Sequence, residues 1–343
     1  MTRPLLALTQ GDPAGIGPEI LLKLLAQGPP TPWRPLLIAE RAALEALRPS
    51  LPTFPWDRLR YVSSPPKTDE IQTDDIPVLD PVGSSRQLSL GSSGPSDAAG
   101  AMAALDAGIA LVRGGLADAL VTAPVSKESI ARQLLPGFKG HTDYLAEACG
   151  LERYGRDYLM AFLAPELQVA LLTVHMPLRE ALDEIREETI AEALDCLHRH
   201  AGGRIALAGL NPHAGEGGLL GEEDGRILAP AVAAGRGRGI DVHGPESADS
   251  LFARARRGEF DWVLALYHDQ GLIAVKTAAF GLATNWTLGL PFLRTSVDHG
   301  TAFGLAGRGL ADEGPMRAVV EATLGIIGGR LPRRSTDTRT STD

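Results

Sequence analysis

The chain has 343 residues, of which 44% are apolar and 22% are charged, with a formal net charge of −9. This negative balance excludes an electrostatic nucleic-acid binder, which needs a basic excess to replace phosphate counterions. No apolar stretch approaches the ~20 residues that span a bilayer, and the two cysteines, Cys149 and Cys196, form no metal-type pair. We therefore expect a cytoplasmic globular protein without membrane or nucleic-acid partners, and its length favours two lobes.

Strand and helix patterns alternate along the first part of the chain. Residues 49–81 interrupt the alternation, because prolines crowd there and the periodicity fades into loop with short strands. Alternation of single strands with helices is typical of a mainly parallel sheet with helices on both faces. In chain order we expect strands at 5–9, 34–40 and 117–125, and helices at 18–27, 41–47 and 96–115.

The second part of the chain begins with two β-rich runs within 158–176, which a Pro-Glu turn divides into a hairpin. One long amphipathic helix is predicted over 178–202. Residues 204–218 and 260–271 then repeat one pattern, an apolar strand followed by a polar loop. The tail, 331–343, is poor in apolar residues and is expected to be disordered.

Three histidines share one local context. His175 follows the strand-forming run VALLTV, His213 follows IALAGLNP, and His268 follows WVLALY. Ligands of open α/β sheets bind at the carboxyl ends of the strands. Neutral imidazole is the commonest transition-metal ligand, and three protein ligands are typical of a catalytic metal site. The pattern therefore favours a metal site, while hydrogen-bonded structural histidines would follow strands in the same way.

Two polar clusters suit an anionic substrate. His141 and Thr142 precede the apolar periodicity of GHTDYLAEACG, so they fall at a helix N-terminus, where free N–H groups favour an anion. Thr142 also suits a simple capping role. Lys276, Asn285 and Arg294 would bind a phosphorylated or carboxylated substrate if they gather. Scattered residues on a solvated face are the alternative.

Two glycine-rich stretches lack nucleotide-binding fingerprints. GDPAGIGPE, at 11–19, is without the G-x-G-x-x-G order of a Rossmann turn, and GEGGLLGEEDGR, at 215–226, lacks the Lys-Ser/Thr ending of a P-loop. Neither stretch by itself indicates nucleotide binding.

Five segments together closely resemble the 4-hydroxythreonine-4-phosphate dehydrogenase family of pyridoxal phosphate biosynthesis. They are TQGDPAGIGPEI, GHTDYLAE, NPHAGEGG, YHDQGLIAVK and NWTLGLPFLRTSVDHGTAFGLAGRG, in the family's order and reaching to about residue 309. Only residues 49–81 and the tail lack a distinctive match. A fainter resemblance to isopropylmalate-type dehydrogenases rests on GDPAGIGPE and DHGTAFGLAGRGLAD, with one departure, because Gly304 stands where that loop often carries an acid.

The resemblance implies a two-lobed α/β/α fold with mainly parallel sheets, which is isocitrate/isopropylmalate dehydrogenase-like and non-Rossmann. It implies one catalytic unit over 1–330, with lobes of approximately 1–130 with 270–330 and 131–269, and with the site in the cleft between them. It also implies a homodimer whose active site lies at the subunit interface.

The resemblance further assigns roles to single residues. Three imidazoles suit Zn²⁺ or Co²⁺, whereas Mg²⁺ prefers oxygen ligands; the choice between NAD and NADP stays open. The implied roles are metal ligands for His175, His213 and His268, phosphate-end contacts for His141 and Thr142, further substrate contacts for Lys276, Asn285 and Arg294, cofactor binding for His299, Gly300, Thr301 and Ala302, and catalytic groups for Lys276, Asp269 and Asp249.

The implied reaction is NAD(P)-dependent oxidation of 4-phosphooxy-L-threonine at C3, followed by decarboxylation to 3-amino-2-oxopropyl phosphate. A metal would acidify the C3 hydroxyl, and Lys276, or a water that it holds, would accept the proton. No residue separates this substrate from 4-phospho-D-threonate or 4-phospho-D-erythronate. A related diol dehydrogenase would not need the phosphate-end pair, and a non-catalytic metal- and phosphate-binding sensor would bind ligands without producing NADH.

Overall fold

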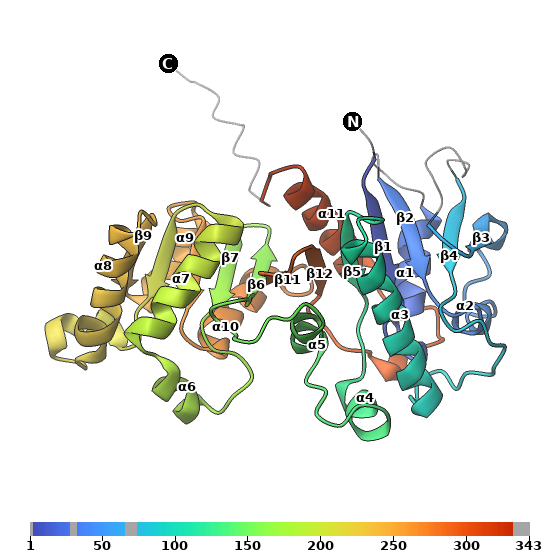
Figure 1. Ribbon diagram of the computed structural model, residues 1–343, viewed down its shortest axis with the longest axis horizontal. Helices are drawn as coiled ribbons and strands as arrows, with labels where there is room; N and C mark the ends of the chain where they lie inside the picture. The colour runs from blue at the N-terminus through green and yellow to red at the C-terminus, as the bar shows by residue number, and fades with distance from the viewer. Residues whose placement is uncertain (1–2, 28–32, 66–73, 332–343) are drawn as a thin grey trace, which may run out of the picture. The chain divides into compact units, whose positions relative to one another are not determined.

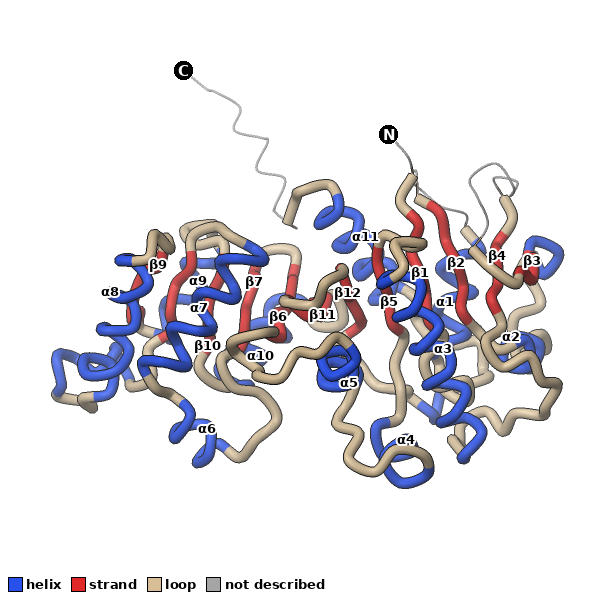
Figure 2. Tube along the Cα trace, viewed as in Figure 1, coloured by secondary structure: helices blue, strands red, loops and turns tan. Residues whose placement is uncertain are grey.

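The computed structural model describes residues 3–27, 33–65 and 74–331. The chain divides into two compact units, the first containing Met1–Cys149 and Pro291–Ile327 and the second containing Gly150–Leu290. Strands and helices alternate along each unit (Figures 1 and 2). No helix in the described ranges is long and apolar enough to cross a membrane. The expected disorder of the tail concerns residues that, from 332 on, lie outside these ranges, and it stays a prediction.

The first unit is built on six parallel strands in the order β3-β4-β2-β1-β5-β12. Its elements are β1 (Leu5–Thr9), α1 (Gly17–Ala26), β2 (Arg34–Ile38), α2 (Arg41–Ala46), β3 (Leu59–Val62), β4 (Ile76–Leu79), α3 (Pro95–Arg113), β5 (Ala119–Thr122), α4 (Lys127–Gln133), α5 (His141–Ala148), β12 (Leu293–Val297) and α11 (Gly314–Ile327).

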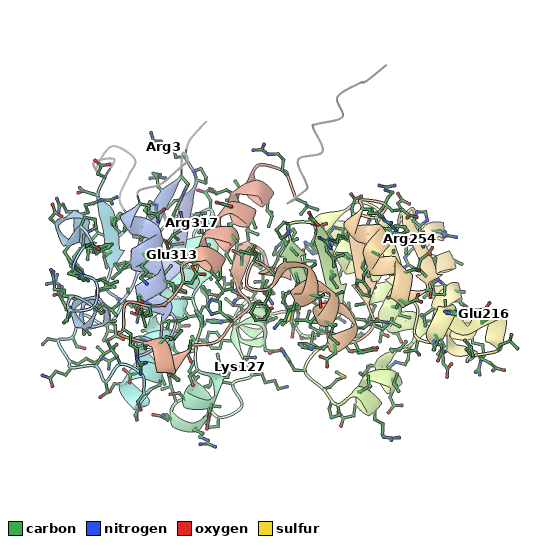
Figure 3. The ribbon with its side chains drawn as sticks, turned by 180° about the vertical axis from the view of Figure 1, so that it is seen from behind. Arg3, Lys127, Glu216, Arg254, Glu313 and Arg317 are labelled. Atoms are coloured by element: carbon green, nitrogen blue, oxygen red, sulfur yellow. The ribbon has the colours of Figure 1, made fainter. Side chains whose placement is uncertain are left out.

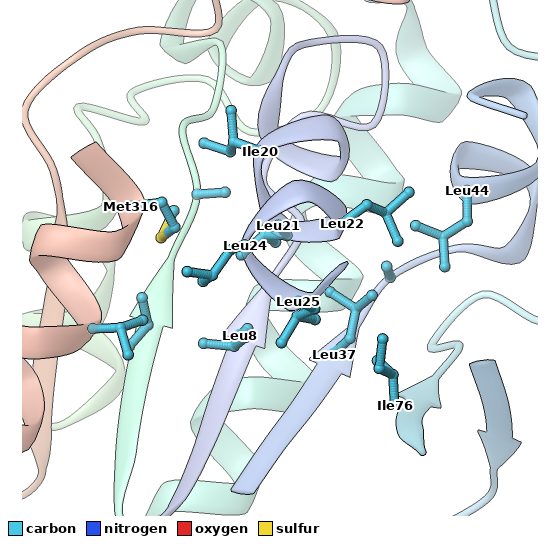
Figure 4. Close-up of a cluster of buried hydrophobic side chains, with 14 of the residues drawn as sticks. Leu8, Ile20, Leu21, Leu22, Leu24, Leu25, Leu37, Leu44, Ile76 and Met316 are labelled. Carbon is cyan, nitrogen blue, oxygen red and sulfur yellow. The ribbon is translucent and has the colours of Figure 1, made fainter. Parts of the chain in front are cut away.

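Alternating residues of β1 serve two different cores in this unit. Leu6 and Leu8 join a cluster of buried side chains from α1 and α11 (Figure 4). Thr9 lies against α3 instead, where a Cβ on Gly108 would come within 2.9 Å of the Thr9 methyl group. Because successive side chains of a strand point to opposite faces, the parallel sheet is covered on both sides.

The second unit has the strand order β11-β6-β7-β10-β8-β9. The pairs β11–β6 and β6–β7 are antiparallel, whereas β7–β10, β10–β8 and β8–β9 are parallel. Its elements are β6 (Leu159–Ala164), β7 (Leu167–Leu171), α6 (Leu178–Glu184), α7 (Glu187–Ala201), β8 (Ile205–Ala208), α8 (Ala229–Gly237), β9 (Val242–Glu246), α9 (Ala248–Arg256), β10 (Trp262–Ala265), α10 (His268–Ala279) and β11 (Thr284–Leu288).

The α/β class and the predicted hairpin are confirmed, the hairpin as the antiparallel pair β6–β7. The single long helix over 178–202 is wrong, because the structure has α6 and α7 with a break between them. At the break Ile185 is buried at ψ 90°, and the Arg186 N–H donates to the Thr189 hydroxyl, 3.1 Å away. A side-chain acceptor for the N–H of the residue that precedes a helix, here Arg186, stabilises the start of that helix.

The chain passes from the first unit to the second after Cys149 and returns to the first after Leu290. Both boundaries lie later in the sequence than the divisions that we expected, after residues 130 and 269. α5 stays with the first unit, since the Tyr144 hydroxyl donates to Asp106 of α3 at 2.6 Å. β11 belongs to the second unit because it pairs with β6 over its full length. The amino-acid composition does not reveal such contacts, so a boundary that is predicted from the sequence differs from the boundary in the structure.

Replacing Gly17 with alanine tests how closely α1 approaches the end of β1. A Cβ on Gly17 would lie 2.0 Å from the Gln10 carbonyl oxygen, which is backbone and cannot turn aside. We expect Gly17→Ala to lower the free energy of unfolding by about 1–3 kcal/mol, as overpacking does, although alanine favours helices. The measurement is urea-induced unfolding followed by circular dichroism.

Gly237→Ala provides the matched control for this substitution. Gly237 also lies in a helix, α8, and a Cβ there would meet nothing within 4 Å. We expect this variant to be as stable as the wild type or more stable by about 0.5–1 kcal/mol. Equal stability of the two variants would contradict the close approach.

Candidate functional site

The three strand-end histidines follow neighbouring strands of the second unit. His175 comes after β7, His268 after β10 and His213 after β8, and β10 lies between the other two. Since these strands run parallel, their carboxyl ends share one edge. Parallel α/β sheets bind ligands at this edge. The strand ends are therefore placed as the sequence predicted.

His175 and His268 form a close pair, with ring centroids 5.5 Å apart. Two hydrogen bonds connect the loops that carry them. The Leu172 N–H donates to the Ala265 carbonyl and the Thr173 hydroxyl donates to the Leu266 carbonyl, both at 2.8 Å. These bonds extend the β7–β10 pairing beyond the strands, so the two imidazoles emerge side by side.

His213 does not join this pair within one chain. It lies in the turn Pro212–Gly218, and its Nδ1 is 2.9 Å from a carboxylate oxygen of Glu216. Among the described residues, no three or more His, Cys, Asp or Glu side chains are arranged to hold a metal ion. A three-histidine site would therefore need an imidazole from outside this chain.

The chemistry of these donors fits a borderline metal ion. The Nδ1 of His268 is 2.7 Å from Asp269 and the Nδ1 of His213 is 2.9 Å from Glu216. A carboxylate on one ring nitrogen fixes the tautomer and leaves the other, Nε2, as the donor to a metal. Imidazole donors of this kind suit Zn²⁺ or Co²⁺ better than Mg²⁺.

Asp249 and Asp269 line one pocket of the second unit, of about 590 Å³, together with Tyr267 and Gln270 from the same edge. The hydrogen bond from the Ser247 hydroxyl is the main cause that lowers the pKa of Asp249, and the charge of His213 acts in the same direction. Asp249 therefore stands near His213 as an ionised acid.

Lys276 and Asn285 lie in the same unit but do not line that pocket. Lys276 is exposed in the last turn of α10, and Asn285 is nearly buried in β11. Both side chains have interactions with neighbouring groups. The structure thus groups the two acids in one pocket, whereas Lys276 and Asn285 lie outside its lining.

The first unit brings His141 near two positive charges. This imidazole is the first residue of α5, and its buried Nε2 has no hydrogen-bond partner among the described residues. Burial, followed by the positive charges of Arg294 and Lys127, holds the pKa of His141 well below its usual value. A neutral ring therefore lies near two cations. An anionic group bound here would interact with both cations and with the ring.

Arg294 is the buried one of these two cations, at 2% exposure in β12, whereas Lys127 is exposed. The Nη2 of Arg294 donates to the Thr122 hydroxyl at 2.7 Å. Burial lowers the pKa of Arg294 to about 9, so the guanidinium keeps its charge at neutral pH. One of the two predicted phosphate-end residues, His141, thus lies near Arg294, which the sequence had placed with Lys276 and Asn285. The other, Thr142, is nearly buried.

The loop after β12 packs on the first βα turn of the same unit. The Ile16 N–H donates to the Thr301 carbonyl at 3.0 Å, and a Cβ on Gly15 would approach the Thr301 Cβ to 3.1 Å. A side chain at position 15 would therefore crowd Thr301, which would have to shift by a few tenths of an ångström. His299, Gly300, Thr301 and Ala302 all lie in the loop, and a Cβ on Gly304 would meet nothing within 4 Å. The space around Gly304 would accept an acidic side chain. Packing therefore does not explain why this chain has a glycine where the isopropylmalate-type loop often carries an acid.

A buried carboxylate and a lysine of α1 fasten the far end of this loop. The Nζ of Lys23 donates to the carbonyls of Gly309 and Ala311, at 2.8 and 2.6 Å. Glu19, which is fully buried, accepts the Ala311 N–H at 2.8 Å and also contacts Lys23 at 3.1 Å. The helix α1 thus fixes both the start and the end of the loop.

Sequence reasoning missed Lys127, Glu19 and Lys23. Lys127 begins α4 directly after Ser126, whose hydroxyl accepts the Ser129 N–H at 3.1 Å. In the sequence, the serine that caps the helix directly before Lys127 was the only feature that marked this lysine. Glu19 and Lys23 stand four residues apart in an ordinary apolar helix, which resembles any surface ion pair.

These features define the class of the protein. The structure has parallel strands with polar groups at one edge, a buried imidazole nitrogen near two cations and a loop fastened at both ends. These features are typical of an α/β enzyme, because a scaffold gains nothing from a buried imidazole nitrogen that no described residue satisfies.

Comparison with known proteins identifies the family. Residues 32–323 match the family described as pyridoxal phosphate biosynthetic protein PdxA. A 4-hydroxythreonine-4-phosphate dehydrogenase of Acidithiobacillus ferrooxidans is 40% identical over 347 aligned residues, covering 96% of this chain and 98% of that protein. The chain therefore belongs to the PdxA family.

Solved structures agree with this assignment. The 4-hydroxythreonine-4-phosphate dehydrogenase of Klebsiella pneumoniae has a TM-score of 0.84 at 36% identity, covering 94% of this chain and 99% of that one. A terephthalate 1,2-cis-dihydrodiol dehydrogenase of Burkholderia xenovorans has a TM-score of 0.63 at 28% identity, covering 96% of this chain and 99% of that one. The fold is thus shared by dehydrogenases with different substrates.

Acid should destabilise the protein through His141. At a pH above 6.5, the usual pKa of histidine, the His141 ring is neutral in the folded and in the unfolded protein. At a lower pH the unfolded chain binds a proton at His141, whereas the folded protein does not, because its His141 pKa is well below 6.5. Stability is therefore lost as the pH falls, by up to about 1.4 kcal/mol per pH unit. We expect His141→Gln to remove this dependence when urea unfolding is compared at about pH 6.5 and 5.5.

His198→Gln serves as the control, because His198 is an exposed histidine of α7. It should keep the pH dependence of the wild type. If His141→Gln shows the same dependence of the unfolding free energy on pH as the wild type, the imidazole at position 141 is not held neutral.

Proposed function

We propose that this chain oxidises 4-phosphooxy-L-threonine at C3, with NAD(P) and a divalent metal, and releases CO₂ to give 3-amino-2-oxopropyl phosphate in pyridoxine 5′-phosphate biosynthesis. Membership of the PdxA family supports the dehydrogenase role. The observation that supports a phosphorylated substrate is that the buried Arg294 and the exposed Lys127 both lie near the neutral His141.

The phosphate end of the substrate binds beside these residues. Arg294 supplies a fixed, desolvated charge, and the Nε2 of His141, which has no partner among the described residues, supplies a hydrogen bond. Thr142 adds a hydroxyl at the start of α5, where backbone N–H groups also point toward an anion. A substrate without phosphate would forgo these charge-assisted hydrogen bonds and should bind more weakly.

The loop His299–Ala302 holds the nicotinamide cofactor, which accepts the hydride from C3 when bound. Thr301 is the best-supported member of the set, because its backbone is fixed by Ile16 and by the close approach of Gly15. Glu19 and Lys23 hold the other end of the loop. The chain contributes a preformed surface and no chemistry of its own at this point.

His175, His213 and His268 hold the divalent metal, Zn²⁺ or Co²⁺ by donor type, which supplies Lewis acidity for oxidation and decarboxylation when bound. Only His175 and His268 pair within one chain. We therefore propose a homodimer in which a second copy completes the ligand set. Asp269 and Glu216 orient the rings by accepting from Nδ1.

Lys276, directly or through a water, accepts the proton of the C3 hydroxyl as the hydride leaves. Asp269 and Asp249 are the acids at the same strand edge and hold or relay protons there. Asn285 and Lys276 bind the carboxylate end before it departs as CO₂. Each of these steps is hydrogen bonding or proton transfer by side chains of this chain.

An assay with purified protein tests the proposal. With 4-phosphooxy-L-threonine, Zn²⁺ or Co²⁺ and either cofactor, absorbance at about 340 nm should rise as NAD(P)H forms. Removal of the metal with a chelator should abolish the rise, and re-addition should restore it. The phosphate-free alcohol should react at least about a hundredfold more slowly, because it lacks the group that Arg294 and His141 would bind.

Three comparison substrates make this assay decisive. 4-Phospho-D-threonate and 4-phospho-D-erythronate keep the phosphate but replace the amine, so faster turnover of either would assign the chain to another substrate of the same family. The third comparison substrate is a cis-dihydrodiol, the kind of compound named for the Burkholderia enzyme, and it lacks the phosphate. Ligand binding without NAD(P)H would favour a sensor.

Lys23→Met tests whether α1 positions the cofactor loop. The variant loses the ammonium that binds the Gly309 and Ala311 carbonyls. We expect the KM for NAD(P) to rise about threefold to tenfold while kcat changes little, because the loop contacts the cofactor and not the reacting substrate. Steady-state kinetics with the cofactor varied would measure this. An unchanged KM, or a fall confined to kcat, would contradict the role.

A further inference from the structure

The turn that carries His213 has a left-handed backbone. Its residues His213, Ala214 and Glu216 have φ values of 53°, 51° and 45°, and the intervening Gly215 and Gly217 also have positive φ. Left-handed conformation is unfavourable for every residue that has a Cβ. Three such residues in one turn therefore persist only because the surrounding structure holds them there.

Asp224 is the group that holds the turn. Its side chain is 1% exposed and both carboxylate oxygens are used. Oδ1 accepts the Leu210 N–H at 2.8 Å, and Oδ2 accepts the backbone and side-chain N–H groups of Asn211 at 3.0 and 2.9 Å. With three donors around it, the carboxylate fixes the two residues that lead into Pro212 and His213.

Gln270 connects the same turn to the neighbouring strand end. Its side-chain N–H donates to the Gly209 carbonyl at 2.8 Å, and its side-chain oxygen accepts the Leu266 N–H at 2.7 Å. Gln270 stands two residues after His268. The base of the His213 turn is therefore tied to the segment that carries another candidate metal ligand.

The turn determines what His213 presents to its surroundings. The side chain is 62% exposed, and its Nδ1 contacts Glu216 within the turn, which lies on the surface (Figure 3). The left-handed backbone brings these two side chains together three residues apart. With Nδ1 engaged, Nε2 is the nitrogen left for a ligand.

We propose that Asp224 is a positioning residue for metal binding, in that its buried carboxylate holds the left-handed turn and so orients His213 toward a divalent cation. This inference rests on the metal-dependent function proposed above. Asp224 itself is not a ligand, since its oxygens are buried and occupied by N–H donors. Its effect on the metal passes through His213.

Binding of Co²⁺ to the metal-free full-length protein tests the proposal without any turnover. Asp224→Asn keeps the size of the side chain but replaces one acceptor oxygen by an N–H₂ group, which faces existing donors. We expect the Kd for Co²⁺, from titration of the visible absorption, to rise about tenfold to hundredfold, as loss of outer contacts to a metal site does.

Asp261→Asn is the matched control. Asp261 also lies in the second unit and accepts a backbone N–H, that of Arg204 at 2.8 Å, away from the His213 turn. It should bind Co²⁺ as the wild type does. Melting temperatures of both variants separate a lost orientation from a lost fold, and weakened binding by Asp261→Asn equal to that of Asp224→Asn would overturn the proposal.

A double-mutant cycle shows whether Asp224 acts through His213. His213→Ala should weaken Co²⁺ binding, and adding Asp224→Asn to it should weaken binding no further. Additive losses would overturn the proposal, as would a wild-type Kd for Asp224→Asn. If the wild type binds no Co²⁺, the metal-dependent function and this inference both fail, whereas wild-type binding with an unaffected Asp224→Asn removes the inference alone.

Gly215→Ala perturbs the same turn without changing any charge. Gly215 has φ +81°, and a Cβ there would lie 2.7 Å from the Gly221 carbonyl oxygen. This variant should also raise the Kd for Co²⁺, and it keeps the test valid if Asp224→Asn fails to fold. Unchanged Co²⁺ binding by Gly215→Ala would show that the left-handed turn does not orient a ligand.

Discussion

The shared edge of β7, β10 and β8 is the constraint on which the candidate chemistry of the second unit depends. Three neighbouring parallel strands deliver the segments that follow them to one edge. Hydrogen bonds from Leu172, Thr173 and Gln270 then join those segments beyond the strands. The backbone positions of the three histidines are thus set by the sheet, and only the direction of each ring is left to its own loop.

The two units solve opposite electrostatic problems. In the first, burial keeps the His141 ring neutral, while the buried guanidinium of Arg294 keeps its charge. A buried guanidinium near a neutral imidazole suits an anion, because hydrogen bonds from a charged donor to an anion are strong. In the second, His213 and His268 are at least partly exposed and each contacts a carboxylate. Exposed, oriented imidazoles suit a cation.

The sequence predicted what periodicity and strand ends determine. The alternating elements, the hairpin and the histidines after strands follow from apolar runs with polar residues behind them. It missed the break before Arg186, because a helix restart depends on one hydroxyl, that of Thr189, reaching back to an N–H. It placed Arg294 with Lys276 from their proximity in the chain, and it gave no sign that Arg294 also lies near His141. Pairings of this kind arise from sheet order, which a single sequence does not display.

Both units use a buried carboxylate to fix a loop, and the choice of residue has a physical reason. Glu19 accepts the Ala311 N–H and contacts Lys23, and Asp224 accepts three N–H groups around Asn211. A carboxylate offers only acceptors, so every donor around it is satisfied, whereas an amide would turn a donor toward donors. Hydrogen bonds to a charged acceptor are also stronger. Burying each charge is costly by itself, but the donors that surround it are those of a loop that would otherwise adopt many conformations. Glu19 and Asp224 thus hold these loops while they are themselves inaccessible to a ligand.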